Sequence, residues 1–218
     1  MIDTRQARYL AVYLVADPDQ TTSDLPTTVI EAIDGGVTAV QFRSKRQTDR
    51  DAFALAGRLR AICRDRYLPF IVNDRVALAL AVDADGVHVG VDDLPVKIVR
   101  RLLGPSRIVG YSPETDEQAR TAARGCVDYL GIGPVFSTSS KDDAPPPIGI
   151  DGIRRITRLA SIPVVGIGGI TAERASSVVN AGAAGVAVIG AILRAPNPAG
   201  AAKTLRDAVE QVYPVSSR

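Results

Sequence analysis

Residues 128–141 (DYLGIGPVFSTSSK) hold the two patterns that decide the fold, a short apolar run and a polar loop directly after it. The run at 128–132 has the length of a buried strand, and the Gly133-Pro134 pair ends it. The loop then carries three groups that bind anions, namely the hydroxyls of Thr138 and Ser140 and the ammonium of Lys141. A solvated Ser/Thr-rich loop is the alternative interpretation of this segment alone, so the rest of the chain must decide.

Working outward, the same alternation of a short apolar run with a longer amphipathic segment occurs eight times. The expected strands are 10–15, 38–42, 69–72, 86–89, 107–110, 128–132, 163–167 and 185–189. The expected helices are 25–35, 48–64, 75–82, 93–103, 114–124, 149–160, 171–181 and 198–212. Strands that are apolar on both faces are typical of a parallel sheet covered by helices. Eight such units predict an α/β fold, a single (β/α)8 TIM barrel formed by residues 1–218.

An open, doubly wound sheet is the competing fold. Its dinucleotide-binding form has a GxGxxG loop after the first strand, whereas this chain has Ala16-Asp17-Pro18 there. The closed barrel is therefore preferred. In such a barrel the active site is built from the loops that follow the strands, so those loops are where functional residues are expected.

Composition excludes several classes of protein. The chain has 218 residues, 46% of them hydrophobic and 23% charged, and a net charge of +2, so we expect no nucleic acid partner. The run Tyr9–Ala16 resembles the core of a signal peptide but stops at Asp17-Pro18, and we expect a buried strand instead. No segment has the ~20 apolar residues of a membrane span. Two cysteines and one histidine favour neither a zinc site nor a disulfide scaffold, and predict a cytoplasmic protein.

Two cations and an amide follow the second expected strand. Gln41, Arg43 and Lys45 alternate with other residues, so their side chains should point to the same side of the strand. Two positive charges spaced in this way suit a diphosphate. The alternative is a solvated basic turn, which Arg46 would extend.

Carboxylates follow the third and fourth expected strands, as Asn73-Asp74 and Asp92-Asp93. Acids at the ends of neighbouring strands can share Mg²⁺, which takes one or two protein carboxylates together with water and substrate phosphate. Alternatively, each acid could cap the helix that follows it. His88 lies within the apolar run 86–89 and is expected to be a buried, hydrogen-bonded histidine rather than a catalytic base.

The remaining strand ends offer hydroxyls and backbone amides. Ser112 follows the fifth expected strand, Gly168-Gly169 follows the seventh, and Ile189-Gly190 ends the eighth. Amides after strands seven and eight commonly bind phosphate in barrels of this kind. The barrel mouth thus offers two anion sites, one of them assisted by a metal. The sequence contains no convincing pair of nucleophile and base, which favours electrostatic stabilisation of a departing diphosphate over covalent catalysis.

Taken together and in order, these segments resemble the thiamine-phosphate synthase family. The resemblance is carried by QFRSK at 41–45, ND at 73–74, GVHVG at 86–90 with Asp93 downstream, GPVFSTSSK at 133–141, VVGIGGI at 164–170 and AVIGAI at 187–192. Members are (β/α)8 barrels that join a phosphorylated pyrimidine, hydroxymethylpyrimidine diphosphate, to a phosphorylated thiazole, hydroxyethylthiazole phosphate. Pyrophosphate is released with Mg²⁺, one ion per active site. A homo-oligomer is compatible with the sequence.

The resemblance also implies a role for each matching residue. Gln41 would contact the pyrimidine, and Asp74 and Asp93 would bind the metal. The residues implied to hold the diphosphate, four of them expected to be catalytic, are Arg43, Lys45, Ser112 and Lys141, together with Asn73. Those implied to receive the thiazole phosphate are Thr138, Ser140, Gly169, Ile189 and Gly190.

Three positions depart from the family pattern. Glu114 replaces the histidine of a GxSxHT segment, Ser140 replaces a threonine, and Gly190 replaces a serine. Two other functions on the same barrel remain as alternatives. One is a thiazole tautomerase-like isomerase, which uses a histidine where this chain has Glu114. The other is a non-catalytic protein that binds the thiazole phosphate, which would need no metal.

Overall fold

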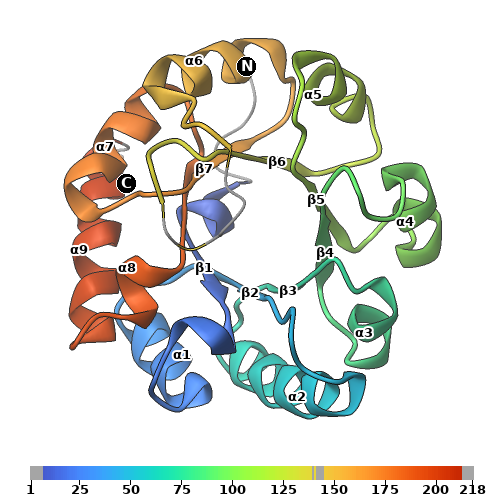
Figure 1. Ribbon diagram of the computed structural model, residues 1–218, viewed down its shortest axis with the longest axis vertical. Coiled ribbons are helices and arrows are strands. Elements are labelled where there is room, and N and C mark those ends of the chain that lie inside the picture. Colours follow the sequence, from blue (N-terminus) through green and yellow to red (C-terminus); the bar gives the residue numbers. More distant parts are fainter. Residues whose placement is uncertain (1–6, 139, 141–144, 213–218) are drawn as a thin grey trace, which may run out of the picture.

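The computed structural model describes residues 7–138, 140 and 145–212, and these form a closed barrel of eight parallel strands in the order β1 to β8. Helices surround the barrel on its outer side (Figure 1). The strands are β1 Val12–Ala16, β2 Ala39–Phe42, β3 Phe70–Asn73, β4 Gly86–Val89, β5 Ile108–Tyr111, β6 Tyr129–Ile132, β7 Val164–Ile167 and β8 Gly185–Val188. The predicted (β/α)8 barrel is therefore confirmed.

The helices follow the predicted order, most of them with shorter ends. They are α1 Leu25–Asp34, α2 Asp49–Asp65, α3 Val76–Ala81, α4 Val96–Leu103, α5 Asp116–Ala122, α6 Gly149–Leu159, α7 Ala172–Asn180, α8 Gly190–Leu193 and α9 Pro198–Glu210. Two short 3-10 helices, η1 Arg8–Leu10 and η2 Pro18–Gln20, flank β1. None of the described helices is both long and apolar enough to cross a lipid bilayer.

Three local differences from the expected elements have clear causes. The first strand begins at Val12 rather than residue 10, because Leu10 ends η1. Helix α4 begins at Val96 rather than residue 93, because Pro95 occupies its N-cap position. Helix α8 was not predicted, since four residues are too few to show a helical period.

The core has two layers because alternate residues of each strand face opposite sides of the barrel wall. One layer lies between the strands and the helices and includes Val40, Val72 and Val87. The other fills the barrel itself, and its fully buried tyrosines are Tyr13 of β1 and Tyr129 of β6. The second layer continues towards the strand ends through polar side chains, and these belong to the candidate site.

Candidate functional site at the carboxyl ends of the strands

The QFRSK segment crosses the rim of the barrel at the end of β2. Gln41 is buried in the barrel interior, where its Nε2 donates to the Tyr13 hydroxyl at 2.9 Å. Arg43 is half-buried, and Lys45 is exposed at the rim. The three side chains therefore lie at different depths in the barrel, although they occupy alternate positions along one segment.

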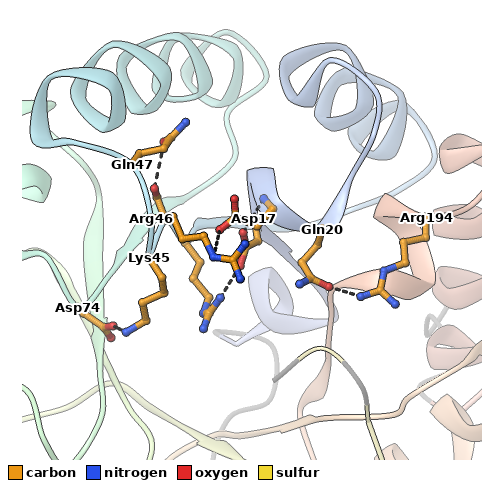
Figure 2. A network of polar contacts seen from close by, with 10 residues as sticks. Asp17, Gln20, Lys45, Arg46, Gln47, Asp74 and Arg194 are labelled. Atoms are coloured by element: carbon orange, nitrogen blue, oxygen red, sulfur yellow. Dashed lines mark hydrogen bonds and ion pairs between the residues drawn. The ribbon is translucent and has the colours of Figure 1, made fainter. Parts of the chain in front are cut away.

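Each of the two cations contacts a carboxylate of a neighbouring strand. Arg43 forms an ion pair with Asp17, which follows β1, and Lys45 forms one with Asp74, which follows β3. Figure 2 shows Lys45 extended towards Asp74. The alternative of a freely solvated basic turn is therefore wrong for Arg43, whereas the side chains of Lys45 and Arg46 are 53% and 78% exposed, each beside one carboxylate.

Asp17 is a site residue that the sequence interpretation missed. Its carboxyl is fully buried, and besides pairing with Arg43 it accepts the backbone N–H of Asp19 at 2.9 Å. A buried carboxylate without a partner would be costly, so Asp17 and Arg43 stabilise each other's charge. The available signal was its position, since an acid directly after the first barrel strand lies on the functional face.

The two predicted metal ligands come together beside Lys45. Asp74 is close enough to Asp93 to affect the pKa of the Asp93 carboxyl, and Asp93 accepts the backbone N–H of Gly90 at 2.7 Å. Partial burial, and then the nearby Asp74, raises the pKa of the Asp93 carboxyl. Neither acid caps a helix, because the N-cap residues of α3 and α4 are Arg75 and Pro95; the capping alternative is thus wrong.

The backbone at Asp74 is held in an uncommon conformation. Its φ is +60°, in the left-handed region that aspartate tolerates better than most residues. Its N–H donates to the His88 carbonyl oxygen at 2.8 Å, which ties the end of β3 to β4. Strain of this kind is typical of residues whose side chain must point in one direction.

The donor set at this position suits a hard cation such as Mg²⁺. Two carboxylates in contact repel each other when both are ionised, and a divalent ion between them would remove that repulsion. Within residues 7–138, 140 and 145–212, no group of three or more His, Cys, Asp or Glu side chains could hold a metal. A pair is nevertheless sufficient for Mg²⁺, since water and substrate oxygens complete its coordination.

Ser112 and Asn73 lie on the same rim. Ser112 follows β5 and is half-buried, and its Oγ is 2.8 Å from His88 Nε2. Asn73 is the last residue of β3 and is paired in register with His88 on β4. His88 itself is only 8% exposed and both its ring nitrogens have partners, so the expectation of a buried, hydrogen-bonded histidine is confirmed.

A second region, after β6 and β7, is built mainly from backbone. The loop after β6 pairs with the loop after β7, through Val135 N–H to the Ile167 carbonyl at 2.8 Å and Phe136 N–H to the Gly168 carbonyl at 3.0 Å. Gly168 and Gly169 both have positive φ, and a Cβ at Gly169 would lie 2.3 Å from the Ser137 carbonyl oxygen. Only glycine fits this junction.

The hydroxyl loop continues from that junction. Thr138 is half-buried, and its Oγ1 accepts the N–H of Ser140 at 3.2 Å. Lys141 lies outside the described residues. The apposition of the two loops places the Thr138 segment and Gly169 side by side, which supports the expectation that they serve one ligand.

The end of β8 leads directly into α8. Ile189 occupies the N-cap position of this short helix and Gly190 is its first residue. Loops after strands seven and eight, together with a short additional helix, form a recurrent phosphate site in such barrels. Arg194 ends α8 and donates to the Gln20 side chain of η2, which joins the β8 and β1 ends of the rim (Figure 2).

Comparison with known proteins identifies a family that this chain matches. Residues 12–192 match the family described as "Thiamine monophosphate synthase". The chain is 48% identical over 206 residues to the thiamine-phosphate synthase of Haloarcula marismortui, covering 93% of this chain and 96% of that protein. It is 51% identical over 180 residues to the enzyme of the same name from Roseiflexus castenholzii, covering 83% of this chain and 79% of that protein.

Solved structures agree with the sequence comparison. Thiamine phosphate pyrophosphorylase from Pyrococcus furiosus superposes with a TM-score of 0.86 at 38% identity, over 95% of this chain and 98% of that one. A geranylgeranylglyceryl phosphate synthase from Thermoplasma acidophilum has a TM-score of 0.69 at 14% identity, over 96% of this chain and 98% of that one, and shows likeness of fold alone.

Proposed function

This chain belongs to the thiamine monophosphate synthase family, and on that premise we propose that it condenses hydroxymethylpyrimidine diphosphate with hydroxyethylthiazole phosphate to give thiamine phosphate and pyrophosphate. It is a transferase of this family. One observation supports the substrate assignment most directly. The Lys45–Asp74–Asp93 cluster lies on the same rim as the backbone cradle after β7 and β8.

The charged cluster is the proposed diphosphate site. Arg43, Lys45, Asn73, Ser112 and Lys141 bind its oxygens, and Asp74 and Asp93 hold Mg²⁺. When bound, the metal ion neutralises charge on the diphosphate oxygens and makes the diphosphate a better leaving group. Arg43 and Lys45 are both paired with carboxylates, so the substrate must take over part of these contacts. Such an exchange places positive charge where negative charge accumulates during departure.

The proposed chemistry needs no nucleophile from the protein. Gln41 orients the aminopyrimidine, whose ring stabilises a methylene cation once the carbon–oxygen bond to diphosphate breaks. The thiazole nitrogen then forms the new carbon–nitrogen bond. The structure brings Ser112 Oγ to 2.8 Å from His88 Nε2, a serine–histidine contact that was not predicted from the sequence. His88 Nδ1 contacts the Tyr129 hydroxyl rather than a carboxylate, so the arrangement differs from a catalytic triad, and in this proposal Ser112 binds the diphosphate.

The backbone region is the proposed thiazole phosphate site. Thr138, Ser140, Gly169, Ile189 and Gly190 would contact the phosphate, largely through N–H groups. Amides held in a rigid loop need no counter-ion and lose little entropy on binding, so this site suits a phosphate that stays attached throughout the reaction.

The two alternatives lack a comparable observation. An isomerase of the tautomerase type would use a histidine at position 114, where this chain has an exposed glutamate whose N–H donates to the Gln118 side chain. A protein that only binds the thiazole phosphate would not need Asp74 and Asp93 beside each other. The synthase assignment accounts for the neighbouring carboxylates, whereas Glu114 departs from the synthase pattern as well.

Pyrophosphate release tests the proposed function. The purified protein is given both substrates with Mg²⁺, with EDTA, and with each substrate omitted in turn. We expect release only when both substrates and Mg²⁺ are present. Binding of the thiazole phosphate without any release would contradict the synthase assignment and favour the binding protein.

A further inference from the structure

Five side chains form a continuous hydrogen-bonded chain across the interior of the barrel. Gln41 Nε2 donates to Tyr13 Oη at 2.9 Å, and the Tyr13 and Tyr129 hydroxyls are 2.8 Å apart. Tyr129 Oη is 2.9 Å from His88 Nδ1, and His88 Nε2 is 2.8 Å from Ser112 Oγ. The chain links the residue proposed to bind the pyrimidine with one proposed to bind the diphosphate.

The surrounding residues make room for this chain. A Cβ at Gly110 would lie 2.2 Å from Tyr129 Cζ and 2.4 Å from His88 Nδ1, and one at Gly131 would lie 2.9 Å from His88 Cε1. The side chains of Tyr129 and His88 therefore occupy the space that a Cβ at Gly110 or Gly131 would need. These two inward-facing strand positions are restricted to glycine for that reason. The register agrees, because Gly110 pairs with His88 on one side and with Tyr129 on the other.

With a neutral His88, only two arrangements form all four bonds and also give both buried phenol protons an acceptor among these five side chains. Burial raises the pKa of both tyrosines, so each phenol keeps its single proton, and a neutral imidazole has one N–H. If the Gln41 amide donates to Tyr13, then Tyr13 donates to Tyr129 and Tyr129 to His88 Nδ1. His88 Nε2–H then donates to Ser112, whose own proton points away from the chain. If Gln41 presents its carbonyl to Tyr13, every bond reverses, and Ser112 donates to His88.

Only the first arrangement matches the substrate at both ends. It leaves the Gln41 carbonyl to accept from the amino group of the pyrimidine, and it leaves the Ser112 hydroxyl to donate to an anionic diphosphate oxygen. In the reversed arrangement Gln41 turns its N–H groups towards the ligand, where they could bond a ring nitrogen but not accept from the amino group, and Ser112 turns its oxygen lone pairs towards the anion. The contact with the amino group and the hydrogen bond to the diphosphate would both be lost.

Resting on the proposed function, we propose that Tyr13, Tyr129 and His88 are positioning residues that couple the orientation of the Gln41 amide to the hydrogen-bond direction of Ser112. The chain selects a pyrimidine that has an amino group at position 4, and it does so jointly with the diphosphate. Binding of the amino group fixes the hydrogen-bond direction of Ser112, and binding of the diphosphate fixes the orientation of the Gln41 amide. Binding of the two parts is consequently cooperative, and the coupling is reciprocal.

The first test compares two inhibitors that differ in the group at position 4 and, with it, in the proton on the neighbouring ring nitrogen. Inhibition constants are measured for non-reacting pyrimidine diphosphates with a 4-amino or a 4-oxo group, so that differences in reactivity do not enter. We expect the protein to prefer the amino compound strongly and Tyr129→Phe to reduce that preference about tenfold, the value of one hydrogen bond to a charged or buried group. Tyr9→Phe is the matched control, since Tyr9 packs against the same interior cluster and its hydroxyl is not a member of the chain.

The second test measures the coupling itself. Binding of 4-amino-2,5-dimethylpyrimidine is titrated with and without saturating inorganic pyrophosphate. We expect pyrophosphate to tighten pyrimidine binding about tenfold in the protein and in Tyr9→Phe, and by less than about twofold in Tyr129→Phe. Tyr13→Phe cuts the chain at another bond and should give the same loss, which keeps the test valid if one variant folds poorly.

The outcomes separate this inference from the proposed function. Unchanged selectivity and coupling in both Tyr13→Phe and Tyr129→Phe, with normal pyrophosphate release by the unmodified protein, would overturn the coupling and leave the synthase assignment intact. Failure of the unmodified protein to release pyrophosphate from the two substrates would overturn the synthase assignment, and the coupling with it.

Discussion

The two halves of the barrel rim differ in how they present positive potential. The half formed by β2, β3 and β4 uses side chains, and there Arg43 and Lys45 are each held by a carboxylate. The half formed by β6, β7 and β8 uses backbone, with Gly168 and Gly169 in conformations that other residues rarely adopt. Ionised side chains give strong attraction that depends on partners, whereas amides give weaker attraction that depends on loop geometry.

This difference corresponds to the two proposed substrates. Diphosphate must leave, so its site needs groups that stabilise charge developing on its oxygens and that can return to protein partners afterwards. The thiazole phosphate only has to be held, which a rigid backbone cradle does without rearrangement. Substitutions in the two halves should therefore have separable effects.

The largest effect is expected from Lys45→Ala. Removing the cation leaves Asp74 without its partner and the departing diphosphate without one of its charges, so kcat/KM should fall about 10²–10³-fold. Steady-state kinetics with each substrate varied in turn measures this. Arg46→Ala is the matched control, since Arg46 is largely exposed and its ion pair with Asp19 is long, at 3.8 Å. We expect kcat/KM to change by roughly twofold or less. Equal losses in both variants would mean that only the overall charge of the turn matters.

Asp74→Asn should weaken metal binding more than substrate binding. Asparagine also tolerates the positive φ of this position, so the backbone is retained while one ligand charge is lost. We expect the Mg²⁺ concentration at half-maximal activity to rise at least about tenfold. The neighbouring Asp92→Asn provides the control, because Asp92 is exposed. Unaltered metal dependence in Asp74→Asn would remove Asp74 from the metal site.

Gly169→Ala should damage the backbone half selectively. The left-handed conformation costs a non-glycine residue about 1–2 kcal/mol. The new Cβ would also meet the Ser137 carbonyl oxygen. We expect a lower free energy of unfolding in urea and a raised KM for the thiazole phosphate, with little change in KM for the diphosphate. Gly57→Ala, in the middle of α2 with no atom near the added Cβ, should instead stabilise the protein slightly. A Gly169→Ala variant affecting both KM values equally would show that the halves are not independent.

The smallest effect is expected from Gly190→Ser. A Cβ there would make only ordinary contacts, at 3.4–3.5 Å from Arg194, and the added hydroxyl could donate to the phosphate. KM for the thiazole phosphate should fall roughly threefold to tenfold, the net value of a typical hydrogen bond. An increase in KM instead would place the phosphate away from the first turn of α8.

Particular residues show how far sequence reasoning reached. The strand ends at Asn73-Asp74 and Gly168-Gly169 were located correctly because parallel strands bring their carboxyl ends to one rim. Asp17 was missed because one acid beside a proline gives no pattern in the sequence. Tyr13 and Tyr129 were missed as members of the polar chain because, within apolar strands, they are indistinguishable from ordinary core residues.

The sequence alone determined the eight-fold alternation of strand and helix and the chemical character of each strand end, since both depend on local pattern and on the order of segments. Only the tertiary structure decided which charges pair, Arg43 with Asp17 and Lys45 with Asp74, and which polar groups meet inside the barrel. Tyr13 and Tyr129 are 116 positions apart in the chain, and their hydroxyls meet because closure of the barrel brings them together. Contacts of that kind depend on strand register and on space left by Gly110 and Gly131, which no local pattern encodes.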